Sequence, residues 1–253
     1  MTSVAFVDGQ GPTRVLVLHG WFLDSQVWNK SRPLTDLDAF TYAYVDFPGY
    51  GVNRPADPAQ GISGMADVAL AAAEELGWDR FAILGHSMGG ATATVVAARQ
   101  PDRVLSVAAL TPAAPGGSAL DDATYQAFLD AYAAPGDTIR AALSPHMSEA
   151  DAADIEKWNR DSMDQDVWIA YLANWSRGAP TESLARIAAP TTLLVGESDL
   201  FVTREYLEPT GRAIARSRFV EVPGGHYPMV EHPQRSVELW EAALSSAGQT
   251  RAT

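Results

Sequence analysis

The sequence contains no cysteine, which excludes a disulfide framework, a thiolate nucleophile and cysteine-ligated metal sites. Lysine is scarce, since Lys30 and Lys157 are the only lysines, and the formal net charge is −13. Nucleic-acid binding requires a basic face that neutralises phosphates, so we expect no nucleic-acid partner. An acidic surface of this kind is typical of a soluble protein.

Long hydrophobic runs are also absent. No apolar stretch approaches the roughly 20 residues that span a bilayer. The opening residues, MTSVAFVDGQGP, lack the basic region and the apolar stretch of a secretory signal. We therefore expect a cytoplasmic protein with no membrane partner, present as a monomer or homodimer. The sequence shows neither H-x-x-x-H nor calcium-loop spacing, so we expect no metal and no cofactor.

What is present is a globular composition. The chain has 253 residues, 47% hydrophobic and 19% charged, which suits one large α/β domain or two small ones. Several apolar runs end in turn-forming residues: Arg14–Gly20, Phe40–Gly49, Phe81–Ser87, Val104–Leu110, Thr191–Asp199 and Arg218–Gly225. Helix-like segments lie between them: Met65–Leu76, Met88–Arg99, Arg204–Ala215 and Pro233–Ala247. This alternation predicts a mostly parallel central sheet with helices on both faces.

One stretch interrupts the alternation of strands and helices. Pro112–Ala189 contains no convincing strand and is rich in acidic, alanine and aromatic residues. We interpret residues 112–189 as a helical insertion between two strands. The core of the fold is then formed by residues 1–111 and 190–253. Ligands of such a sheet bind at the carboxyl ends of its strands.

The segment FAILGHSMGG places Ser87 between Gly85 and Gly89, where an apolar strand becomes a helix. An abrupt strand-to-helix turn pushes one side chain outward from a strained backbone conformation. Residues two positions away then approach so closely that a Cβ atom would clash. The N-terminal N–H groups of the helix face the exposed hydroxyl. The pattern predicts that Ser87 is a nucleophile and that the N–H of Met88 stabilises an oxyanion.

A serine nucleophile needs a base, and the base needs an orienting acid. Among the five histidines, His226 is the favoured base because it follows a glycine pair after the last predicted strand. Asp199 in GESD is the favoured acid, and Glu197 is its near rival. We expect Asp46 to organise its own loop instead. The predicted triad therefore runs in the order Ser87, Asp199, His226.

These features together resemble the α/β-hydrolase superfamily, from about Arg14 to Ala247. The motifs that carry the resemblance occur in the family's order: LHGW, DFPGYG, GHSMGG, GESD and GGHYPMVEHP. The resemblance implies that the insertion, residues 112–189, is a helical cap. It also implies that Trp21 supplies the second N–H of the oxyanion hole.

Departures from the patterns of particular subfamilies narrow the expected activity. Serine at position 87 disfavours the haloalkane dehalogenases and epoxide hydrolases of this superfamily. Phe22 stands where similar aryl esterases and cofactor-free haloperoxidases usually have proline, which disfavours a perhydrolase side activity. The loop Trp21–Leu23 and Tyr227 differ from the residues usual in carbon–carbon bond hydrolases.

We therefore expect a serine hydrolase, a carboxylesterase or lactonase, that acts on neutral, apolar small molecules through an acyl-enzyme on Ser87. Four aromatic residues are expected to contact the substrate: Trp21, Phe22, Trp158 and Trp168. Three alternatives stay open. They are a carbon–carbon bond hydrolase with the same triad, a cyanohydrin lyase if Lys157 reaches the site, and a receptor-like member with little turnover.

Overall fold

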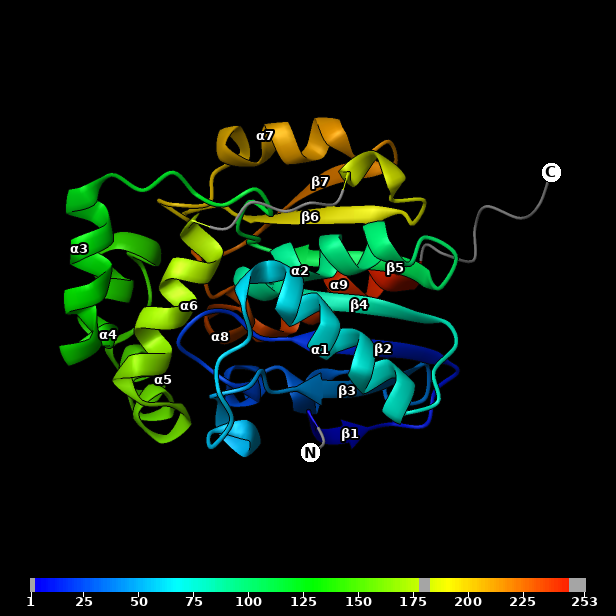
Figure 1. Ribbon diagram of the computed structural model, residues 1–253, viewed down its shortest axis with the longest axis horizontal. Helices are drawn as coiled ribbons and strands as arrows, with labels where there is room; N and C mark the ends of the chain where they lie inside the picture. The colour runs from blue at the N-terminus through cyan, green and yellow to red at the C-terminus, as the bar shows by residue number, and fades with distance from the viewer. Residues whose placement is uncertain (1–2, 178–182, 246–253) are drawn as a thin grey trace.

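The fold is built on a seven-stranded sheet with the strand order β1-β3-β2-β4-β5-β6-β7 (Figure 1). The computed structural model describes residues 3–177 and 183–245. The strands are β1 (Val4–Asp8), β2 (Thr13–Leu18), β3 (Phe40–Val45), β4 (Phe81–His86), β5 (Val104–Leu110), β6 (Thr191–Gly196) and β7 (Ser217–Val222). Neighbouring strands are parallel except for β1, which pairs antiparallel with β3. The mostly parallel sheet expected from the sequence is confirmed, whereas the edge strand β1 was not expected.

Helices cover both faces of the sheet. The helices α1 (Gly61–Glu75) and α2 (Met88–Arg99) lie on one face, and α9 (Pro233–Ser245) lies on the other (Figure 1). At the β7 edge, α7 (Arg204–Ala213) packs against that strand, and the short α8 (Pro228–Glu231) precedes α9. The predicted helices are confirmed with small shifts of their ends. The predicted end of the last helix at Ala247 lies outside the described residues.

The insertion connects β5 to β6 and stands at one end of the sheet, on the left in Figure 1. Its main helices are α3 (Asp122–Asp130), α4 (Pro135–Thr138), α5 (Glu149–Ser162) and α6 (Gln165–Arg177). A single π-helical segment, Ile139–Leu143, follows α4. The described parts of the insertion, 112–177 and 183–189, contain no strand. In the chain segments that the structure describes, no helix is long and apolar enough to cross a membrane.

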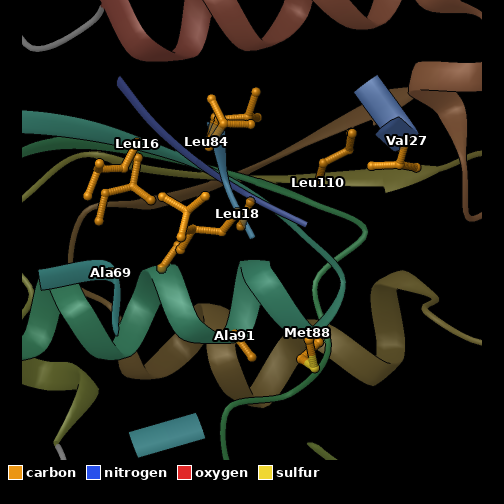
Figure 2. Close-up of a cluster of buried hydrophobic side chains, with 14 of the residues drawn as sticks. Leu16, Leu18, Val27, Ala69, Leu84, Met88, Ala91 and Leu110 are labelled. Atoms are coloured by element: carbon orange, nitrogen blue, oxygen red, sulfur yellow. The ribbon is translucent and has the colours of Figure 1, made fainter. Parts of the chain in front are cut away.

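The core forms because the central strands are apolar on both faces. Every residue of β4 and of β6 is buried, as in a parallel sheet covered on both sides. Helix α2 is buried almost throughout, and its small residues let it pack close to the sheet. Figure 2 shows part of this core, with Leu16 and Leu18 of β2, Leu84 of β4, Ala69 of α1 and Ala91 of α2. This rigid layer supports the loops at the carboxyl ends of the strands.

Candidate active site

Ser87 lies at the turn between β4 and α2 and has φ 51° and ψ −116°. A positive φ is costly for a residue with a side chain and persists only where neighbouring contacts hold it. Here the Ser87 N–H donates to the carbonyl of Leu110 at 2.9 Å, and its carbonyl accepts from the N–H of Ala91 at 3.0 Å. The strained turn expected from the sequence is therefore present.

The glycines on either side of Ser87 allow this turn to approach the rest of the core. A Cβ atom at Gly85 would lie 2.3 Å from the carbonyl oxygen of Gly89. A Cβ atom at Gly89 would lie 2.4 Å from the carbonyl oxygen of Leu18. Neither position could hold a larger residue without moving the backbone, as the motif predicted.

His226 lies in the loop between β7 and α8 and faces Ser87. Its Nε2 is 3.0 Å from Ser87 Oγ, and its Nδ1 is 2.7 Å from Asp199 Oδ2. The other carboxylate oxygen of Asp199 accepts from the N–H groups of Phe201 and Val202, both at 2.9 Å. His226 and Asp199 are 4% and 6% exposed. Because the carboxylate accepts from Nδ1–H, Nε2 is free to accept the proton of the serine hydroxyl.

The rival acids lie elsewhere. The side chain of Glu197 is exposed, while that of Asp199 is buried against His226. Asp46 accepts from the backbone N–H groups of Ser25 and Val52, so it organises its own loop as expected. The structure thus brings together the three residues that the sequence selected for the triad.

Two further histidines are buried close to the site, but both have structural hydrogen bonds. His19 donates from Nδ1 to the carbonyl of Gly20 and accepts at Nε2 from the N–H of Phe47. His86 donates from Nε2 to the carbonyl of His226 at 2.9 Å. Burial lowers the pKa of His19 and lowers that of His86 well below its usual range, so both rings stay neutral. The remaining histidines are exposed: His146 and His232.

The expected oxyanion-hole donors lie on either side of Ser87. Met88 begins α2, and Trp21 follows Gly20 in the loop after β2. A Cβ atom at Gly20 would lie 3.2 Å from the Cβ of Ser87, so this loop passes next to the serine. Neither the Met88 nor the Trp21 backbone N–H donates to another group within the described residues. Both donors are therefore available to a substrate oxygen.

A pocket with an empty volume of about 350 Å³ opens onto Ser87 and His226. Its aromatic wall comes from the core and the insertion: Trp21, Phe22, Phe128, Trp175, Phe201 and Tyr227. Apart from His226, no titratable acid or base lines it among the described residues. A pocket of this size and lining suits a small apolar group joined to one polar reacting group.

The predicted substrate contacts are partly found at this pocket. Trp21 and Phe22 line it, but Trp158 and Trp168 do not. Trp168 is buried behind the wall, where it stacks on Phe22 with ring centroids 5.0 Å apart. Trp175 lines the pocket from the same helix, α6. The helical spacing that places Trp168 and Trp175 on one face could have identified it.

No residue of the site is placed to hold a metal. Across residues 3–177 and 183–245, no group of three or more histidine, aspartate or glutamate side chains could bind a metal ion. The chemistry available to the described side chains is therefore nucleophilic attack by Ser87 with proton transfer through His226.

A buried carboxyl pair beneath the oxyanion loop makes stability depend on pH. Burial, together with the charge of Asp46, raises the pKa of Asp24 to about 6. The unfolded chain has the ordinary, lower pKa, so the stability gained from neutral Asp24 is complete at low pH and lost as pH rises through about 6. We expect Asp24→Asn to raise the free energy of unfolding at pH 8 by about 1–3 kcal/mol, and much less at pH 4.5.

Urea unfolding of wild type and variant at the two pH values measures this effect. Asp121 provides a matched control, because it also caps a helix and accepts from the N–H of Thr124, yet it is exposed. Hydrogen bonds lower the pKa of Asp121, so Asp121→Asn should bring no gain at pH 8. An equal effect of Asp24→Asn at both pH values would contradict the assignment.

Comparison with known proteins identifies the family. The chain matches the alpha/beta hydrolase fold over residues 13–233. The pimeloyl-[acyl-carrier protein] methyl ester esterase of Nitrosomonas europaea is 26% identical, covering 92% of this chain and 96% of that protein. The dihydrolipoyllysine-residue acetyltransferase component of the acetoin cleaving system from Cupriavidus necator is 34% identical, covering 49% of this chain and 32% of that protein.

The chain spans between 30% and 42% of the length of the curated relatives that are 34% to 39% identical to it. Among solved structures, the enol-lactonase from Burkholderia xenovorans LB400 has a TM-score of 0.81 at 19% identity, covering 95% of each chain. That likeness is one of fold. With the family match extending over most of its length, the chain belongs to the alpha/beta hydrolase fold family.

Proposed function

We propose that this hydrolase cleaves neutral carboxylic esters or lactones through an acyl-enzyme on Ser87. The observation that supports this proposal is the hydrogen-bonded series Ser87, His226, Asp199, which ends at the floor of an aromatic pocket. The curated relatives include methyl ester esterases, and the solved structures of the same fold include esterases and lactonases. Both groups are consistent with acyl transfer.

In the proposed mechanism, Ser87 Oγ attacks the acyl carbon while Nε2 of His226 accepts its proton. The imidazolium then protonates the leaving alcohol, and Asp199 stabilises its charge. The N–H groups of Trp21 and Met88 donate to the oxyanion of the tetrahedral intermediate. A water molecule, activated by His226, then attacks the acyl carbon and releases the acid.

The lining of the pocket supports a neutral substrate. A carboxylate or phosphate buried there would have no cation to pair with, and an unpaired buried charge costs several kcal/mol. The net charge of −13 adds a field that disfavours anionic substrates. A small neutral acyl or aryl group fits both observations.

The lyase alternative depends on Lys157, and its surroundings do not support that role. The Lys157 side chain is 71% exposed and forms an ion pair with Asp161 at 2.5 Å on the outer surface of α5. A cation that takes part in cyanohydrin cleavage would have to face the pocket. The carbon–carbon hydrolase and receptor alternatives are separated from the ester hydrolase by experiment.

The test compares two p-nitrophenyl esters of equal chain length, one ending in a methyl group and one ending in a carboxylate. We expect kcat/KM to be at least roughly tenfold higher for the neutral ester, which corresponds to about 1.4 kcal/mol. A preference for the anionic ester would contradict the pocket assignment and leave the triad intact. Turnover of a cleavable diketone with none of the esters would instead support carbon–carbon hydrolysis, and binding without turnover would support a receptor.

A further inference from the structure

We propose that two residues of the insertion, Ser144 and Asn159, are positioning residues of the reaction. Ser144 holds the loop that carries His226, and Asn159 holds the oxyanion loop, residues 20–23. The inference rests on the proposed function, because positioning has a kinetic meaning only for a working triad. It assigns the insertion a part in catalysis beyond that of a pocket wall.

Ser144 follows the π-helical segment Ile139–Leu143 and is completely buried. Its Oγ accepts from the backbone N–H of His226 at 2.8 Å and donates to Oε1 of Glu231 at 2.9 Å. The same Glu231 oxygen accepts from the N–H of Gly225 at 3.0 Å. Ser144 and Glu231 therefore fix two successive peptide groups of the histidine loop.

The backbone of the histidine loop is shaped to receive Ser144. A Cβ atom at Gly225 would lie 2.5 Å from Ser144 Oγ, so only glycine permits this approach. On the opposite side, the carbonyl of His226 accepts from His86 Nε2 at 2.9 Å and from Thr111 Oγ1 at 3.0 Å. The core thus holds the carbonyl of His226, while the insertion holds its N–H.

Asn159 makes the equivalent contact with the oxyanion loop. It lies on α5, is 1% exposed, and donates from Nδ2 to the carbonyl of Phe22 at 2.9 Å. Phe22 has φ 55°, a left-handed conformation that costs a side-chain-bearing residue on the order of 1–3 kcal/mol. The N–H of Phe22 is held by the Tyr50 hydroxyl at 3.3 Å. Without Asn159, the Phe22 carbonyl loses a buried partner and the strained turn is free to relax.

A third contact joins the insertion to the same loop. The indole N–H of Trp21 donates to the carbonyl of Trp168 on α6 at 3.0 Å. Trp21 is the residue whose backbone N–H is the expected oxyanion donor. A shift of the oxyanion loop would therefore move a donor that has to lie within about 3 Å of the developing charge.

Other polar contacts between insertion and core end on loops that carry no candidate catalytic group. Asn174 on α6 donates to the carbonyl of Ala59 at 2.6 Å, and the Tyr171 hydroxyl donates to the carbonyl of Pro48 at 2.8 Å. These contacts dock the insertion. Asn174 is therefore a matched control for Asn159, since it has the same side chain and the same type of acceptor on a neighbouring helix.

For the oxyanion loop, we expect Asn159→Asp to lower kcat by roughly 100-fold with little change in KM, because a small misplacement affects the transition state more than the substrate. Aspartate keeps the shape of asparagine but cannot donate to Phe22. Asn159→Ser, a smaller and uncharged variant, is the second substitution in case the buried carboxylate prevents folding. Asn174→Ala should stay within about threefold of wild-type kcat.

For the histidine loop, we expect Ser144→Ala to lower kcat by roughly 10- to 100-fold. Ser144→Thr keeps the hydroxyl and should restore most of the rate. The readout that a merely structural role would not change is the downfield proton resonance of the hydrogen bond between His226 and Asp199. This resonance should broaden or disappear in Ser144→Ala and persist in Asn174→Ala.

The rate at which a fluorophosphonate labels Ser87 gives a second measure in every variant. Folded Asn159 and Ser144 variants with wild-type kcat and labelling would overturn the inference while the proposed function stands. An equal loss in Asn174→Ala would also overturn it, since any weakening of the insertion would then suffice. Absence of ester turnover and labelling in the wild type would instead refute the proposed function.

Discussion

Ser87→Ala is expected to abolish ester turnover, with a loss of kcat on the order of 10⁶, and to abolish labelling by a fluorophosphonate probe. The reason is that no other described hydroxyl lies within hydrogen-bonding distance of His226 Nε2. Alanine keeps the Cβ of serine, so the turn at φ 51° is no more strained in the variant. The residual rate would come from binding and the oxyanion donors alone.

A buried serine on the neighbouring strand provides the control. Ser106 on β5 donates to the carbonyl of Leu244 at 2.9 Å and does not face the pocket. Ser106→Ala should keep full labelling even if it lowers stability. Labelling that survives in Ser87→Ala would refute the assignment of the nucleophile.

Asp199→Asn is expected to lower kcat on the order of 10⁴, by analogy with the best-studied serine triad. The backbone N–H groups of Phe201 and Val202 would keep the amide oxygen on their side. The amide NH₂ would then face Nδ1 of His226 and force its proton onto Nε2. A ring with that tautomer cannot accept the proton of Ser87.

Glu197→Gln tests the rival acid in the same assay. Its side chain is exposed, so we expect kcat within about twofold of wild type, as is usual for surface substitutions. Thermal unfolding of both variants shows whether the folded state is retained. If Glu197→Gln were the damaging substitution and Asp199→Asn were not, the acid would be wrongly assigned.

The strands that are buried on both faces could be predicted from sequence because their apolar runs are continuous. β4 and β6 are entirely buried, and each ends in residues of a recognisable turn. The edge strand β1, Val4–Asp8, has only partly buried residues and is stabilised by its antiparallel partner β3. That pairing depends on tertiary structure, and the sequence around β1 contains no signal for it.

The triad could also be predicted, because its chemistry requires particular residues at particular turns. The pocket wall could not, since it is assembled from distant segments. Phe128 and Phe201 contact each other with centroids 5.8 Å apart, yet one lies in the insertion and the other follows β6. Ser144 was missed for the same reason, because its partner His226 is brought to it only by the completed fold.

The point at which the insertion leaves the core has an evolutionary consequence. β5 and β6 are neighbours in the sheet, with Val107 paired to Thr191, so the insertion closes a loop between adjacent strands. The entropic cost of such a loop grows with the logarithm of its length, by about 0.6 kcal/mol for each doubling. Lineages can therefore lengthen, shorten or exchange this segment without rebuilding the sheet. Selection on it then acts through the few polar groups that must still reach the loops beneath.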